Sequence, residues 1–142
     1  MTIKIVHMKR SGLTVPKDQL FDLSRSSKKY YLLSNEYTHL PLHKTKAKYQ
    51  VKTVEDAISN YTTSLKNHLM EEFKLPHQQT PYRSVLLSLY NSYVKLKEHN
   101  KEMYFGCWCK DELNPKPYDH DCHCDYIKEL IYKRYNVLNK VY

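Results

Sequence analysis

The sequence predicts a single small α/β domain over residues 1–142, with a mostly parallel sheet of three to five strands flanked by helices. Apolar segments typical of strands are separated by segments whose apolar residues recur at helical spacing. The length of 142 residues suits one compact domain. Hydrophobic residues make up 41% of the chain and include 14 Tyr, enough for a core and too many for a disordered chain.

The first third of the chain is expected to contain short strands and one short helix. Residues 3–9 alternate apolar and polar side chains, which predicts a strand, and Gly12 closes the turn that ends it. Residues 16–28 predict a helix with Pro16 in its first turn and Leu20, Phe21 and Leu23 buried. Residues 30–34 predict a second strand, and residues 48–51 a short extended segment.

The remainder is expected to form three helices and one buried strand. Thr53 followed by Asp56 has the pattern of a capping box, and the apolar residues after it lie on one helical face. A second helix is expected from position 81 to about 100. Residues 103–109 are almost wholly apolar, which predicts a strand covered on both faces, and a final helix is expected from about Cys122.

Composition and charge exclude several classes of protein. No apolar run approaches the roughly 20 residues of a membrane-spanning helix, and the N-terminus lacks the layout of a signal peptide. Collagen, coiled coil and secreted toxin are excluded as well, and reduced thiols in the cytoplasm are expected. The 23 Lys and Arg against 15 Asp and Glu give a net charge of +8. This charge favours a small anionic ligand, a nucleotide or nucleic acid as the partner. The alternative is a basic surface that only aids solubility.

All four cysteines lie where the strand 103–109 and the last helix are expected to meet. Cys107 and Cys109 are two apart on that strand, so both thiols should point to one side. Cys122 and His123 should occupy the first helical turn, where free N–H groups favour a thiolate or an anion. The closing strand, loop and helix are therefore predicted to carry a convergent Cys/His cluster.

Three interpretations of this cluster are open. One is a tetrahedral zinc site with ligands from Cys107, Cys109, Cys122 and His123, and with Cys124 and His120 as alternates. Another is a metal-free site in which Cys109, Cys122 or His123 acts on a small ligand as the catalytic group. The third is simple packing, because cysteine is among the most buried residue types.

A second candidate site is the polar loop that follows the predicted strand 30–34. Asn35, His39, Lys44 and Lys46 offer donors suited to phosphate or to a polar ring. The alternative is a solvated loop with an Asx turn at Asn35.

Three segments taken together resemble a known family. They are the first strand with its basic end, the loop Ser34-Asn35-Glu36-Tyr37-Thr38-His39, and the closing Gly106-Cys107-Trp108-Cys109 followed by Cys122-His123-Cys124-Asp125. This order is similar to the uncharacterised bacterial and phage family called domain of unknown function 4326. The resemblance spans nearly the whole chain. This chain departs from the family at Glu36, where members often carry Pro, at Cys124, where they more often carry a small residue, and in a longer loop after Cys109.

The resemblance implies an intracellular α/β protein, in the host cytoplasm if a phage encodes it. It also implies site positions, of which the ligand-binding ones are Arg10 (or Lys9), Asn35, Tyr37, His39 and Asp125. Our first hypothesis is a protein that binds or processes a small phosphorylated, nucleotide-like molecule at the Cys/His cluster, with or without zinc. The alternative is a zinc-stabilised module that binds nucleic acid or a host protein without catalysis.

Overall fold

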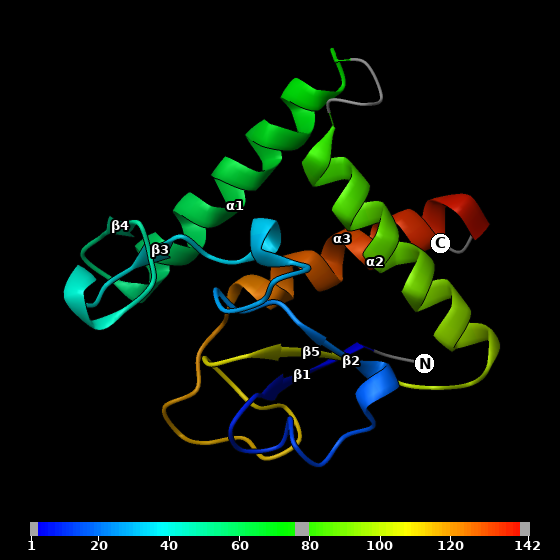
Figure 1. Cartoon of the computed structure of the whole chain (residues 1–142), viewed down its shortest axis with the longest axis horizontal. Coiled ribbons are helices and arrows are strands. Elements are labelled where there is room, and N and C mark those ends of the chain that lie inside the picture. Colours follow the sequence, from blue (N-terminus) through cyan, green and yellow to red (C-terminus); the bar gives the residue numbers. More distant parts are fainter. Residues whose placement is uncertain (1–2, 76–79, 140–142) are drawn as a thin grey trace. The chain divides into compact units, whose positions relative to one another are not determined.

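A parallel three-stranded sheet organises the N-terminal and C-terminal parts of the chain in the computed structural model, which describes residues 3–75 and 80–139 (Figure 1). Strand β5 (Met103–Cys107) lies between β1 (Ile3–His7) and β2 (Leu20–Asp22), and both neighbours pair with it in parallel. The register of β1 places His7 opposite Cys107, so the two strands end together. This sheet confirms the predicted α/β class and its parallel strands. The strands predicted over 3–9 and 103–109 are present but end two residues early, at His7 and Cys107.

The central strand is buried on both faces, as its apolar run predicts. Met103, Phe105 and Cys107 are at most 1% exposed, and their neighbours Ile3 and Ile5 on β1 are buried to the same degree. Because β5 pairs on both edges and is covered on both faces, nearly every residue that it contributes must be apolar.

Three helices and a small second sheet complete the fold. The helices are α1 (Val54–Glu72), α2 (Pro81–Glu98) and α3 (His123–Asn139), and all three were expected. The Thr53 hydroxyl accepts a hydrogen bond of 3.0 Å from the backbone N–H of Asp56, which confirms the predicted N-cap of α1. The two-stranded sheet pairs β3 (Tyr37–Thr38) with β4 (Tyr49–Gln50) in parallel, and β4 confirms the extended segment expected over 48–51.

The prediction of a helix over residues 16–28 is wrong. Lys17–Gln19 forms only a single 3₁₀ turn, and Leu20–Asp22 then becomes the edge strand β2. Its Leu20, Phe21 and Asp22 lie opposite Tyr104, Phe105 and Gly106 of β5. Pairing with the second edge of β5 therefore outweighs the helical spacing of a short apolar segment.

The predicted strand at residues 30–34 is also wrong, because Tyr31–Leu33 forms a 3₁₀ helix. Two serine side chains stabilise this turn by bonding the local backbone. The Ser27 hydroxyl accepts from the N–H of Tyr30 at 3.0 Å, and the Ser34 hydroxyl donates to the carbonyl of Tyr31 at 2.6 Å. These local bonds take the place of the ladder bonds that a strand would make.

By its internal contacts the chain divides into two compact units. The first unit combines residues 1–22 with 89–142 and contains the three-stranded sheet, and the second comprises residues 23–88. The single domain over 1–142 therefore stays a prediction. No helix in the described part of the chain is long and apolar enough to cross a membrane.

Candidate metal centre

The four cysteines converge in the first unit, where β5 ends and α3 begins. The sulfur atoms of Cys107, Cys109 and Cys122 all lie within 4.8 Å of one another, and Cys107 and Cys122 approach to 3.5 Å. The ligand atoms of Cys122, His123 and Cys124 form a second group within the same limit. All four thiols are free of disulfide bonds. The cluster thus contains enough donor atoms, close enough together, to hold a metal ion.

Each C-x-C pair folds its second residue back onto its first. The backbone N–H of Cys109 donates to the Cys107 sulfur at 3.5 Å, and that of Cys124 donates to the Cys122 sulfur at 3.3 Å. The expectation that Cys107 and Cys109 lie on one strand is wrong, because β5 ends at Cys107 and a bend follows. The bend still brings both thiols together, and the two donated N–H bonds favour negatively charged sulfur.

Cys122 also caps helix α3. Its sulfur accepts from the N–H of Cys124 inside the first turn, as the hydroxyl of a serine N-cap would. Asp125 completes a capping box, because its carboxylate accepts from the N–H of Cys122 at 2.8 Å. The other Asp125 oxygen binds the Lys110 ammonium at 2.8 Å. Helix start, carboxylate and ammonium together fix the position of the Cys122 sulfur.

Hydrogen bonds within the cluster favour a negative charge on the Cys107 sulfur. The pKa of Cys107 lies far below that of an ordinary thiol, because the thiols of Cys109, Cys122 and Cys124 donate hydrogen bonds to its sulfur and outweigh the effect of burial. The reverse of these bonds raises the pKa of Cys109 and of Cys122, and burial raises that of Cys124. Cys107, Cys122 and Cys124 are 0% exposed, so a dication could balance charge here that solvent cannot.

Arg10 holds the loop between the two cysteine pairs. Its guanidinium binds both carboxylate oxygens of Asp119 at 3.1 Å and lies 3.7 Å from the carboxylate of Asp111. Asp111 is 1% exposed and accepts from the hydroxyl of Ser11 and from the N–H of Leu113 at 3.0 Å. Arg10, predicted to bind a ligand, is therefore bound to this loop through its Asp119 partner.

The remaining predicted residues lie outside the cluster. His120 is exposed, with a ring nitrogen 2.7 Å from the carbonyl oxygen of Asp121. Asn35, Tyr37 and His39 belong to the second unit. The Asn35 side chain accepts from the N–H of Tyr37 at 2.9 Å, which makes the Asx turn that was the alternative for this loop, and it is buried, whereas His39 is exposed.

Sequence reasoning missed Lys110 and Asp111 at this site. A lysine and an aspartate in a polar loop are ordinary surface residues, so only the turn after Cys109 reveals that Lys110 reaches Asp125 and that Asp111 is buried. Ser11, its partner, offered no signal beyond its place in the turn before Gly12.

No family model, no curated protein and no solved structure matches this chain. The likeness to domain of unknown function 4326 therefore remains a resemblance in motifs.

Proposed function

We propose that this protein is a zinc-binding α/β protein in which the four cysteines hold one zinc ion. The observation that supports this most directly is the pair of C-x-C turns, each with an N–H bond to its first sulfur. The thiols of Cys107, Cys109 and Cys122 lie within 4.8 Å of one another, and the thiol of Cys124 lies within that distance of Cys122. Zinc favours four tetrahedral ligands, and thiolates are the usual ones in structural sites.

Cys124 suits the fourth ligand position better than His123 does. Both residues group with Cys122, but the Cys124 thiol also hydrogen-bonds to the Cys107 sulfur, whereas His123 acts on that sulfur through its charge. The Nε2 atom of the His123 ring lies 3.8 Å from the Cys124 sulfur. His123 therefore serves as a neighbour of the cluster, and the ligands are Cys107, Cys109, Cys122 and Cys124.

A structural role for the ion follows from the burial of the site. Three of the four cysteines are 0% exposed and Cys109 is half-buried, so little of the cluster faces a substrate. Such burial favours a closed zinc site over the hypothesis that Cys109, Cys122 or His123 works on a phosphorylated ligand. The ion would fasten the end of β5 to the start of α3 and so fix the loop 108–121.

Cobalt substitution tests both the site and its ligands. Co²⁺ bound by four thiolates gives intense visible bands and sulfur-to-metal charge-transfer absorption, and zinc should displace it. We expect Cys124→Ser to weaken Co²⁺ binding by at least about tenfold, the loss typical of a disturbed metal site. His123→Ala and the exposed control His120→Ala should keep the spectrum of the parent protein. Loss of the bands in His123→Ala with full binding in Cys124→Ser would contradict the assignment.

A further inference from the structure

The positive charge of the chain is concentrated in one segment of the second unit. Residues 23–52, the basic segment, carry seven Lys and Arg side chains and a single acidic one, Glu36. Residues 53–142 carry 12 side chains of each sign, so their charges cancel. Most of the net charge of +8 therefore belongs to 30 residues, a distribution typical of a surface that binds a polyanion.

Most lysines of the basic segment have no carboxylate partner. Arg25 is used within the segment, since its guanidinium donates to the backbone carbonyl of Asn35 and, at 3.0 Å, to that of Tyr37. Lys48 is bound to Glu36 at 3.0 Å. Within the described ranges 3–75 and 80–139, no salt bridge engages the other five lysines, all of which are exposed: Lys28, Lys29, Lys44, Lys46 and Lys52. These five ammonium groups can each bind a phosphate.

Hydrogen bonds hold two lysine-bearing stretches of the basic segment side by side. The Lys46 ammonium donates to the Ser26 hydroxyl at 3.2 Å, which brings the loop between β3 and β4 next to the stretch 26–29. The backbone N–H of Tyr49 donates to the Glu36 carbonyl at 2.9 Å and so fixes β4 beside β3. Figure 1 shows this loop, drawn in cyan, at the N-terminal end of α1. The lysines are therefore presented by one folded surface.

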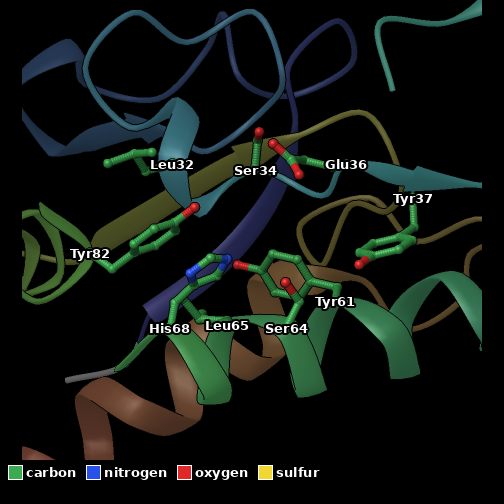
Figure 2. Close-up of a pocket in the computed structure, with 9 residues that line it drawn as sticks. All are labelled: Leu32, Ser34, Glu36, Tyr37, Tyr61, Ser64, Leu65, His68 and Tyr82. Carbon is green, nitrogen blue, oxygen red and sulfur yellow. The ribbon is translucent and has the colours of Figure 1, made fainter. Parts of the chain in front are cut away.

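Exposed aromatic rings lie in the same segment. In the described part of the chain only three tyrosines are exposed, and two of them, Tyr31 at 56% and Tyr49 at 52%, belong to the basic segment. Tyr37 extends from β3 towards α1 (Figure 2), and its ring stacks on that of Tyr49 with centroids 5.2 Å apart. Because Tyr37 covers one face of the Tyr49 ring and the residue is still half exposed, an unpaired base can stack on the other face.

We infer that the basic segment binds single-stranded nucleic acid, with its lysines on the phosphates and with Tyr31 and Tyr49 against the bases. The lysines supply an attraction to the backbone that does not depend on base sequence. The exposed rings favour a single strand over a duplex, whose bases are already stacked on one another. The inference does not rest on the proposed zinc site, because the basic segment lies wholly in the second unit.

Fluorescence anisotropy of a labelled oligo(dT), titrated with the full chain at several salt concentrations, tests the inference. We expect the slope of log K against log salt to be about −1.4 or steeper, for two or more phosphates, and about −3.5 if five lysines each contact one. A duplex of the same length should bind more weakly than the single strand at the same salt. Absence of oligo(dT) binding at low salt, a slope flatter than about −0.7, or tighter binding of the duplex would overturn the inference.

Charge-matched variants locate the binding surface. Lys44→Glu combined with Lys46→Glu reverses two charges of the basic segment, and Lys66→Glu combined with Lys74→Glu makes the same change at exposed lysines of the second unit outside it. We expect oligo(dT) binding to weaken about tenfold or more in the first double variant, because two phosphate contacts are lost, and to stay within about threefold in the second. Circular dichroism should be the same for both. Equal weakening in the two would assign the binding to net charge alone and refute the site.

Tyrosine variants and acidic vesicles separate a nucleic acid from other polyanions. Tyr31→Ser and Tyr49→Ser should each weaken oligo(dT) binding about fivefold or more, the effect of one lost base stack. The control Tyr118→Ser, at an exposed tyrosine of the first unit, should leave the affinity unchanged. Vesicles of equimolar phosphatidylcholine and phosphatidylserine offer phosphates without bases and should bind more weakly than oligo(dT). Unchanged oligo(dT) binding in both tyrosine variants, or tighter binding of the vesicles, would contradict the assignment.

Discussion

Replacing Cys122 separates the two roles that this residue has in the account. Its sulfur belongs to the proposed zinc site, and the same sulfur caps α3 by accepting from the N–H of Cys124 at 3.3 Å. Cys122→Ser removes the thiolate but keeps an oxygen that can cap the helix. Cys122→Ala removes both functions, so the pair distinguishes the metal from the cap.

The expected magnitudes differ for the two roles. Free zinc held at a thousand times its dissociation constant stabilises a protein by about 4 kcal/mol. We expect the parent protein to lose about that much free energy of unfolding when a chelator is added, and Cys122→Ser to lose almost none. Loss of an N-cap costs about 1 kcal/mol, so Cys122→Ala should be less stable than Cys122→Ser by about that amount with or without zinc.

Urea unfolding in zinc buffer and in chelator measures these differences. Circular dichroism follows the helices, and Trp108, the only tryptophan in the sequence, reports on the cluster because it lies between Cys107 and Cys109. Stabilisation of Cys122→Ser by zinc as large as that of the parent protein would refute the role of this sulfur. Equal stability of the serine and alanine variants would refute its role as a cap.

Two further predictions concern the first unit. Gly12→Ala should lower the free energy of unfolding by about 1–3 kcal/mol, because the new Cβ would lie 2.8 Å from the backbone Cα of Met8. Gly106→Ala should lower it by less, because the closest contact of its Cβ is the movable side-chain sulfur of Met8. Urea midpoints in the opposite order would contradict this prediction. Burial, and after it the nearby Tyr132 and Tyr135, raise the pKa of Tyr93 to about 12. The Tyr93 hydroxyl therefore ionises at lower pH in the unfolded chain than in the folded one, and the free energy of unfolding falls as the pH rises from 10 towards 12. The Tyr93→Phe variant should therefore unfold at a higher pH than the parent protein, whereas Tyr49→Phe, a change at a half-exposed tyrosine, should leave the pH of unfolding unchanged. The same pH of alkaline unfolding for all three proteins would refute this prediction.

Long periodic segments and the cysteine spacing were predictable from the sequence. Helix α1 begins at its predicted cap, and β5 is the buried strand that its apolar run predicts. The convergence of the cysteines was predictable because a strand was expected to lead to the first pair and a helix to begin at the second, although the strand ends at Cys107 and the bend after it was not foreseen.

Short segments were not predictable, because tertiary contacts decide them. Leu20–Asp22 forms a strand only since β5 offers an edge to pair with, and Tyr31–Leu33 turns because Ser27 and Ser34 bond the local backbone. The ion pair of Arg10 was not predictable for the same reason, because its carboxylate partner Asp119 lies 109 positions away in the sequence. Spacing within a segment carries no information on such partners.

The metal content of the protein, purified without chelator, tests the central claim most directly. Elemental analysis and titration of accessible thiols on the same sample give ions per chain and free sulfurs per chain. The proposed zinc site predicts about one zinc per chain and thiols that react only after a chelator is added. A metal-free protein that stays metal-free with added zinc, and whose thiols react at once, would contradict it.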